Sequence, residues 1–275
     1  MKLITKFSLL IIALCVACNS DTKEKTMESD SAIKVIAHRG GAKLAPENTL
    51  AAFKKAMALG VDMIEIDVIL SKDGEVIVIH DNTIDRTTNG KGVVKEMNLA
   101  EIKNYDAGSW FDNKYAREKV PTLDEVFETI NGQCTLLIEI KDGDEVFPGL
   151  EKKVVEAVHK YKANDWVVIQ SFNENTVLRV KQMDASLTTY YLLGGNFKDF
   201  YSEIDKLDKT TDKKYDGIAV SKSQINADNT TAIKKTGYKL FVWTVNDPEA
   251  MKVFIEYGVD GIITDSPDKL IEMLK

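Results

Sequence analysis

The chain has 275 residues, of which 44% are hydrophobic and 29% are charged, with 16 glycines and 5 prolines. This composition supplies enough apolar side chain for the packed core of one large domain, and it excludes disordered, collagen-like and low-complexity proteins. The formal net charge of −7 argues against nucleic acid as a partner, because proteins that bind nucleic acid usually present a basic surface.

The N-terminal segment predicts export. Residues 1–17 combine Lys2 and Lys6 with an apolar run too short to span a bilayer, which is typical of a signal peptide. The run ends beside Cys18 and resembles a bacterial lipoprotein signal, in which that cysteine is lipidated and becomes the new N-terminus. Residues 18–32 are polar and predict a flexible tether. We therefore expect an exported bacterial protein, anchored to a membrane as a lipoprotein and facing the periplasm or the cell exterior, with ordinary secretion as the alternative.

From residue 33 onward, short β-branched runs alternate with helical patterns, which favours a parallel sheet. The predicted strands are 33–38, 62–70, 135–141, 166–172, 187–193, 215–221, 239–245 and 260–265. The predicted helices are 49–59, 123–130, 149–161, 175–183, 227–235, 248–257 and 267–274, with a weaker helical signal at 197–207. Eight such units predict an α/β fold, a (β/α)8 TIM barrel over residues 33–275. A doubly wound open sheet is the alternative.

One irregularity interrupts this alternation after the second predicted strand. A turn at 71–74 leads into a further β-like run at 75–80. This pattern predicts a small hairpin inserted before the next helix. Its last residue is one of only three histidines, so the insertion helps to locate the site.

Acidic residues gather at the carboxyl ends of the predicted strands, where barrel enzymes build their sites. Glu65 and Asp67 are two apart on one strand and therefore point to the same side, and Glu139 lies near the end of the next parallel strand. Burying such carboxylates together is unfavourable unless positive charge compensates them. They predict one divalent cation, Mg²⁺ or Ca²⁺, held by oxygen ligands. The alternative is a buried network in which Arg39 and Lys141 merely pair with the acids.

The histidines narrow the range of reactions that this charged cluster could catalyse. His38 and His80 lie within the charged cluster, whereas His159 falls among lysines on a predicted helix. Two imidazoles beside carboxylates suit an acid and base pair, because imidazole titrates near neutral pH. Arg39 and Lys141 offer fixed positive charge to phosphate oxygens. Together these residues predict cleavage of a phosphoester.

The sequence resembles the glycerophosphodiester phosphodiesterase family, a branch of the barrel fold shared with phosphatidylinositol-type phospholipases C. The matching stretches follow the family's order through the whole domain after the tether. They are AHRGG (37–41), PENT (46–49), EIDVILSKDG (65–74), VIHD (78–81), DRTTNGKG (85–92), PTLDEVF (121–127), IEIK (138–141), QSF (170–172), VWTVN (242–246) and GVDGIITDSP (258–267).

The resemblance implies a role for each matching position. His38 and His80 are the implied acid and base catalysts, and the three carboxylates are the implied ligands of a Mg²⁺ or Ca²⁺ ion. The implied substrate-binding residues are Arg39, Lys141, Glu47, Phe172 and Trp243, with Gln170 beside them. For the two aromatic rings, packing in the core is an equally good explanation.

The implied reaction is hydrolysis of a glycerophosphodiester to glycerol 3-phosphate and an alcohol such as choline, ethanolamine or glycerol. Direct attack by water and a first attack by a neighbouring glycerol hydroxyl both agree with the sequence.

Two other functions stay open. One is an enzyme that acts on lysophospholipids through an apolar rim, for which the loop 89–121 with Trp110 and Phe111 is the candidate. The other is a lipid-anchored protein that binds glycerophosphodiesters by closing two lobes about a hinge.

Overall fold

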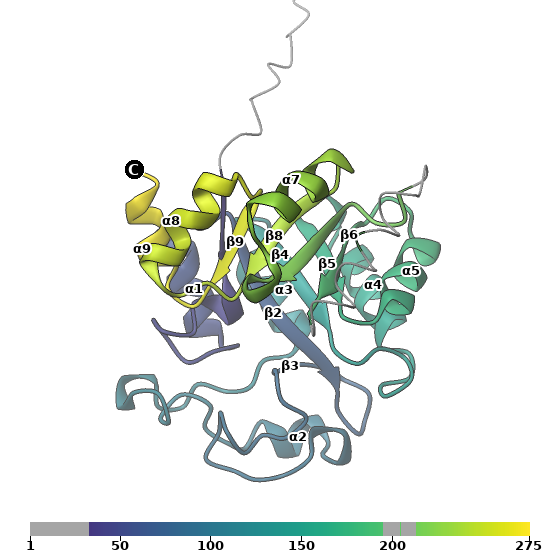
Figure 1. Cartoon of the computed structure of the whole chain (residues 1–275). Coiled ribbons are helices and arrows are strands. Elements are labelled where there is room, and N and C mark those ends of the chain that lie inside the picture. The colour runs from purple at the N-terminus through teal and green to yellow at the C-terminus, as the bar shows by residue number, and fades with distance from the viewer. Residues whose placement is uncertain (1–32, 195–203, 205–212) are drawn as a thin grey trace, which may run out of the picture. The chain divides into compact units, whose positions relative to one another are not determined.

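The computed structural model describes residues 33–194, 204 and 213–275 (Figure 1). The predicted signal peptide, Cys18 and the tether lie outside the described residues and stay predictions. The weak helical signal at 197–207 also falls almost entirely outside them. No helix among the described residues has both the length and the apolar character needed to cross a membrane.

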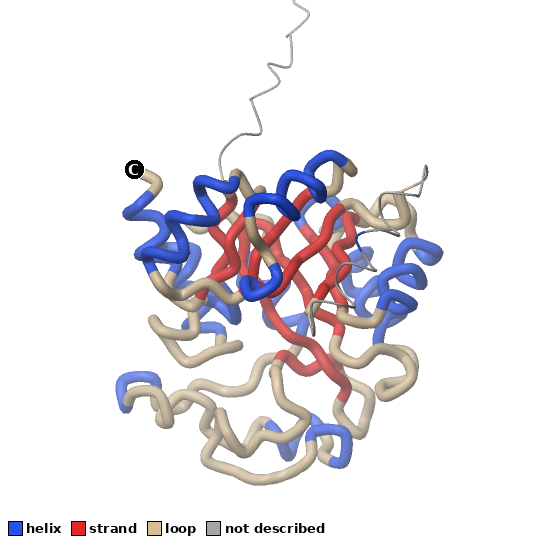
Figure 2. The backbone as a smooth tube through the Cα atoms, viewed as in Figure 1, coloured by secondary structure: helices blue, strands red, loops and turns tan. Residues whose placement is uncertain are grey.

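Eight parallel strands close into a barrel, and they are surrounded by helices (Figures 1 and 2). Around the barrel they are β1 (Lys34–Ala37), β2 (Met63–Leu70), β4 (Thr135–Ile140), β5 (Val167–Ser171), β6 (Thr188–Leu193), β7 (Gly217–Ser221), β8 (Lys239–Trp243) and β9 (Gly261–Thr264). The pairing of β9 with β1 completes the circle. The predicted TIM barrel is therefore confirmed, and the open doubly wound sheet, which would leave two free edges, is wrong.

The helices after the strands begin and end within one residue of the predicted positions. They are α1 (Leu50–Leu59), α3 (Leu123–Ile130), α4 (Leu150–Lys160), α5 (Glu174–Met183), α7 (Ala227–Lys235), α8 (Pro248–Tyr257) and α9 (Pro267–Met273). Local chemistry sets their first turns. Thr122 and Glu125 form a capping box at the start of α3, and Asp247 caps α8, which has Pro248 in its first turn.

The barrel interior holds a small hydrophobic cluster built from strand residues alone. Its members are Ile36, Leu137, Val168, Tyr190, Leu192, Ala219, Phe241 and Ile263. The residues on either side of each member along its strand point outward, because side chains alternate along a strand, and many join the larger core against the helices. Residues two positions beyond each inner member face the interior again, at the carboxyl end of the barrel. That is where the site residues emerge.

The hairpin predicted after the second strand is present. β3 (Val76–Val78) pairs antiparallel with the end of β2. Residues 79–122, which we call the insertion, then run to α3 and contain three short helices: η2 (Val94–Glu96), α2 (Leu99–Ile102) and η3 (Asn113–Tyr115). The carboxylate of Asp106 holds this segment together by accepting the backbone N–H groups of Gly108, Ser109 and Arg117. Helices of three or four residues leave no periodic pattern, so the sequence did not indicate them.

Gly40, in the turn that carries His38, has a tightly constrained place. Its φ is +81°, and an added Cβ would lie 2.8 Å from atoms of both Ala52 and Phe53. We expect Gly40→Ala to lower the free energy of unfolding by about 2–5 kcal/mol, because left-handed strain adds to overpacking. Denaturation followed by circular dichroism measures this loss.

Gly60→Ala is the matched control for this substitution. Gly60 also has a positive φ, +78°, but an added Cβ would meet nothing within 4 Å. Only the left-handed strain of about 1–2 kcal/mol is then expected. Equal losses for the two variants would show that the contacts with Ala52 and Phe53 do not matter.

Candidate active site

The predicted site residues meet at the carboxyl end of the barrel, around a cavity of about 170 Å³. His38 follows Ile36 and Glu139 follows Leu137 at a spacing of two, so each lies just beyond a member of the inner cluster. One wall of the cavity is charged and carries His38, Arg39, Glu65, His80, Glu139 and Lys141. The other wall carries Gln170, Phe172, Leu192, Trp243, Thr244 and Ile263.

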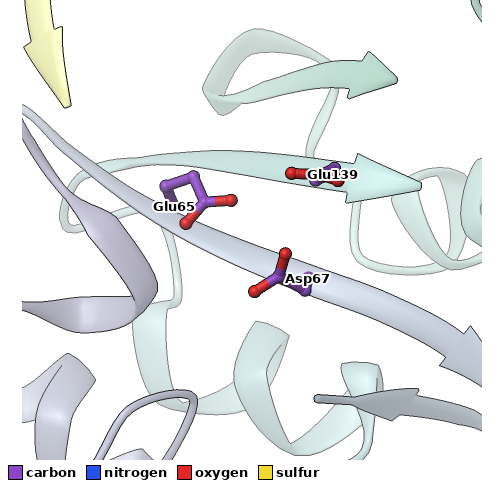
Figure 3. Close-up of side chains that lie close together, drawn as sticks. All are labelled: Glu65, Asp67 and Glu139. Carbon is purple, nitrogen blue, oxygen red and sulfur yellow. The ribbon is translucent and has the colours of Figure 1, made fainter. Parts of the chain in front are cut away.

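Three carboxylates converge at the base of this site (Figure 3). Glu65 and Asp67 come from β2 and Glu139 from the neighbouring β4, and one oxygen of each lies within 4.8 Å of the other two. All three are buried: Glu65 and Asp67 are each 1% exposed. The register of the two strands, with Asp67 opposite Glu139, is what places the acids of separate segments side by side.

Burial and neighbouring charges shift the pKa values of the three carboxylates in different directions. Burial, together with the negative charges of Asp67 and Glu139, raises the pKa of Glu65 to about 8. Burial and the charge of Asp67 likewise raise the pKa of Glu139. For Asp67, burial is outweighed by Arg39 and Lys141, so its pKa is lowered. A buried group of three carboxylates is stable only when compensating positive charge lies close to it.

Arg39 and Lys141 supply part of that charge. Lys141 Nζ lies 2.7 Å from Glu139 Oε1 and 3.6 Å from Asp67 Oδ1, and Arg39 Nε lies 3.4 Å from Asp67 Oδ2. The backbone N–H of Arg39 donates to Glu65 Oε2 at 2.9 Å. The ion-pair network considered from the sequence therefore exists, but it is incomplete. Asp67 Oδ1 is buried and accepts no hydrogen bond from the described residues, and the all-oxygen set fits a hard divalent cation.

His38 is held by a carboxylate that the sequence did not single out. Its Nδ1 lies 2.5 Å from Asp265 Oδ1, at the end of β9. Asn246 secures that carboxylate, donating to Asp265 Oδ2 at 2.6 Å. Burial disfavours the charged imidazole, but the hydrogen bond to Asp265 and the negative charge of Glu65 outweigh it. The pKa of His38 therefore lies above its ordinary value.

His80 has the same arrangement with the opposite result. Its Nδ1 lies 2.7 Å from Asp81 Oδ1, so a carboxylate again orients the ring. Here burial, with the positive charges of Lys141 and Arg39, outweighs Asp67 and Asp81, and the pKa of His80 is lowered. The two imidazoles thus differ in the way that an acid and a base require.

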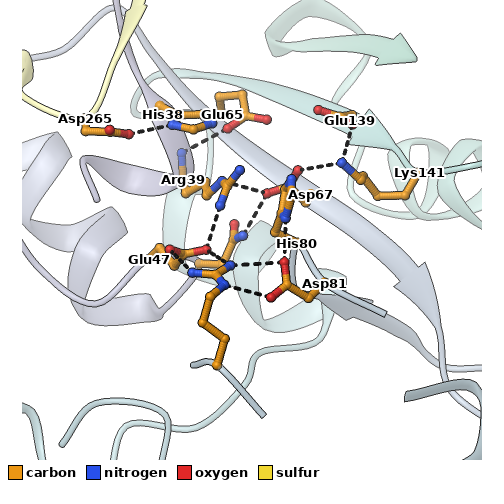
Figure 4. Close-up of polar contacts among 12 residues, drawn as sticks. His38, Arg39, Glu47, Glu65, Asp67, His80, Asp81, Glu139, Lys141 and Asp265 are labelled. Atoms are coloured by element: carbon orange, nitrogen blue, oxygen red, sulfur yellow. Dashed lines mark hydrogen bonds and ion pairs between the residues drawn. The ribbon is translucent and has the colours of Figure 1, made fainter. Parts of the chain in front are cut away.

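Glu47, which the resemblance implied to bind substrate, is not among the described residues that line the cavity. Its Oε1 accepts from Arg39 Nη1 at 2.8 Å (Figure 4). Both its oxygens also accept from Arg86. These guanidinium groups hold the pKa of Glu47 below its usual range despite burial. Glu47 therefore joins the guanidinium groups of Arg39 and Arg86, and its implied contact with substrate stays a prediction.

The opposite wall is mainly apolar. The rings of Phe172 and Trp243 meet edge to face, with centroids 5.4 Å apart. Phe172 is 47% exposed, so it is not a core residue. Gln170 is almost fully buried beneath them, and its Oε1 accepts no hydrogen bond from the described residues. By contrast, Trp110 and Phe111 of the insertion are not among the described residues that line this cavity.

Four functional candidates escaped sequence reasoning: Asp265, Asn246, Asp81 and Arg86. Each lies inside a stretch that carried the family resemblance. Asp81 directly follows its partner His80 in the sequence, so its contact had a local signal. Asp265, Asn246 and Arg86 contact groups from other segments, and for these three the available signal was their presence in those stretches.

The Asp265 contact predicts a measurable change at His38. In Asp265→Asn the hydrogen bond to a carboxylate is lost while burial remains, so we expect the pKa of His38 to fall. A pH titration of the histidine signals by nuclear magnetic resonance, in protein stripped of metal, measures it. His80 and His159 serve as internal references in the same spectra. An unchanged pKa of His38 would contradict the assigned contact.

Comparison with known proteins assigns the chain to a family. Residues 38–269 match the Glycerophosphoryl diester phosphodiesterase family. A glycerophosphodiester phosphodiesterase of Caldanaerobacter subterraneus subsp. tengcongensis is 44% identical over 242 residues, covering 88% of this chain and 97% of that protein. One from Bacillus subtilis is 34% identical over 275 residues, covering 95% of this chain and 93% of that protein.

Solved structures agree. A phosphodiesterase from Oleispira antarctica, in complex with the product sn-glycerol-3-phosphate, superposes with a TM-score of 0.75 at 31% identity, covering 87% of this chain and 95% of that one. A glycerophosphodiester phosphodiesterase from Agrobacterium tumefaciens gives a TM-score of 0.75 at 30% identity, covering 88% of this chain and 100% of that one. From its sequence, its closed barrel and these relatives, the chain is an enzyme that belongs to the glycerophosphoryl diester phosphodiesterase family.

Proposed function

We propose that this chain hydrolyses glycerophosphodiesters to glycerol 3-phosphate and an alcohol, with a divalent cation, Mg²⁺ or Ca²⁺, and with His38 and His80 as acid and base. The observation that carries the proposal is the arrangement of one cavity, in which a buried carboxylate triad adjoins two imidazoles that are each oriented by a further carboxylate. Family membership and the names of the relatives support the reaction class.

Glu65, Asp67 and Glu139 are the residues that would hold the cation. Lewis-acid stabilisation of the charge on the phosphoryl oxygens is what the bound cation supplies. Arg39 and Lys141 line the same wall. They add fixed positive charge where the phosphate has to lie, the guanidinium as a fork and the ammonium as a point charge.

The directions of the histidine pKa values support a division of labour. His38, with its raised pKa, keeps its proton to higher pH and suits protonation of the leaving alkoxide. His80, with its lowered pKa, is neutral near pH 7 and suits removal of a proton from the nucleophile. Since Nδ1 of each ring is engaged by a carboxylate, Nε2 is the atom left for proton transfer.

Phe172, Trp243 and Gln170 form the wall proposed to contact the organic part of the substrate. The rings offer apolar contact to carbon atoms at the mouth. The buried carbonyl oxygen of Gln170 favours a ligand that brings a hydroxyl donor, because an unpaired buried acceptor is unfavourable. A glycerophosphodiester provides both features.

The two other functions considered from the sequence find less support. A binding protein that closes two lobes is not favoured, because the described residues after the tether form one closed barrel. A phospholipase-type enzyme acting on lysophospholipids would use Trp110 and Phe111 as an apolar rim, and neither is among the described residues that line the cavity. Turnover of lysophosphatidylcholine faster than that of glycerophosphocholine would favour the lipid substrate.

Removal of metal is the first test. Purified protein is incubated with glycerophosphocholine, glycerophosphoethanolamine and glycerophosphoglycerol, and glycerol 3-phosphate is measured. We expect EDTA to abolish product formation, because the carboxylate triad is then uncompensated, and added Mg²⁺ or Ca²⁺ to restore it. Full activity in EDTA would favour the ion-pair network without a cation.

Loss of either imidazole is the second test. We expect His38→Ala and His80→Ala to lower kcat by about 10²–10⁴-fold, the usual contribution of acid and base groups, with folding retained. His159→Ala is the matched control, since His159 lies on α4 and pairs with Asp184 away from the cavity. Undiminished turnover by both variants would remove the histidines from the mechanism.

A further inference from the structure

Arg86 belongs to the stretch DRTTNGKG (85–92), for which the proposed reaction supplies no role. It lies in the insertion and is not among the described residues that line the catalytic cavity. Its guanidinium group joins two carboxylates. Nε and Nη2 donate to Asp81 Oδ2 and Oδ1 at 2.7 and 3.2 Å, while Nη1 and Nη2 donate to Glu47 Oε2 and Oε1, both at 2.8 Å.

Each of these carboxylates also contacts a residue of the proposed mechanism. Asp81 Oδ1 lies 2.7 Å from His80 Nδ1, and Glu47 Oε1 accepts from Arg39 Nη1 at 2.8 Å. Figure 4 draws both sets of contacts. Arg86 is therefore separated by a single carboxylate from the imidazole on one side and from the phosphate-facing guanidinium on the other.

Only an arginine can make this double connection. A guanidinium group is planar and can present one edge to each of two carboxylates, whereas an ammonium group is a point charge. The arrangement also governs charge, since the hydrogen bond from Arg86 lowers the pKa of Asp81 to about 2 and keeps it an acceptor. Without Arg86, Asp81 can rotate, and the ring of His80 loses the acceptor that fixes its tautomer.

We propose that Arg86 is a positioning residue that holds His80 and Arg39 in a fixed relative placement, acting through Asp81 and Glu47. The inference rests on the proposed function, in which these two residues move a proton and bind the phosphate. It ties the insertion to the loop between β1 and α1, which are distant in sequence. A misplacement of about 1 Å at a reacting group lowers rates by about 100-fold. Loss of Arg86 should therefore lower the rate of the reaction strongly.

Steady-state kinetics on glycerophosphocholine, with the activating cation present, tests the effect on turnover. We expect Arg86→Ala and Arg86→Lys to lower kcat/KM by about 100-fold, with kcat reduced through His80 and KM raised through Arg39. Guanidinium ion at millimolar concentration should restore part of the activity of Arg86→Ala, and ammonium ion should not. Arg117→Ala, which removes an exposed arginine from the same insertion, is the control and should match the unmodified protein.

A second measurement does not depend on activity. The side-chain ¹⁵N resonances of the three histidines report ring tautomers directly. We expect Arg86→Ala to move or broaden the signals of His80 and to leave those of His38 and His159 unchanged. Arg117→Ala should change none of them.

These outcomes separate the inference from the proposed function. Normal kinetics of Arg86→Lys, or unchanged His80 signals in Arg86→Ala, would overturn the positioning role. A fall in melting temperature that accounts for the lost activity, without rescue by guanidinium ion, would also overturn it in favour of a structural role. If the unmodified protein cleaves no glycerophosphodiester, the proposed function fails, and the His80 signals still decide whether Arg86 positions that ring.

Discussion

The site is organised around one electrostatic constraint, the burial of three carboxylates at the carboxyl end of the barrel. Glu65, Asp67 and Glu139 lie above an apolar inner cluster, and burial raises the pKa of two of them. Such a group persists only where positive charge lies close by. Arg39 and Lys141 provide part of it, and the remaining demand is what makes the group suited to a divalent cation.

A second set of charges surrounds this centre and orients the groups proposed to act. Asp265 and Asp81 each engage Nδ1 of a histidine, and Glu47 engages Arg39. The same kind of contact has opposite consequences for the two rings, because His38 lies beside the negative charge of Glu65 and His80 beside the positive charges of Lys141 and Arg39. The environment, more than the residue type, therefore sets the direction of each pKa, on which the proposed division between acid and base rests.

The closed barrel brings these charged residues together over short lengths of chain. Closure removes both sheet edges and directs the carboxyl end of every strand to one face, so residues from β1, β2, β4, β5, β8 and β9 meet without long excursions of the chain. The insertion after β3 adds His80 and its partners from the side. The rigid inner cluster beneath, which includes Leu137 and Phe241, supports the charged layer from below.

The sequence by itself determined the fold and the inward-facing residues. Strand and helix periodicity is local, and the two-residue alternation that puts Glu65 and Asp67 on one side is written into β2. The partners of those residues were decided by tertiary structure alone. Asp265 reaches His38 because β9 closes onto β1, and Arg86 reaches Glu47 from the insertion. Hydrogen bonds between loops distant in the chain have no sequence period, so only the folded arrangement reveals them.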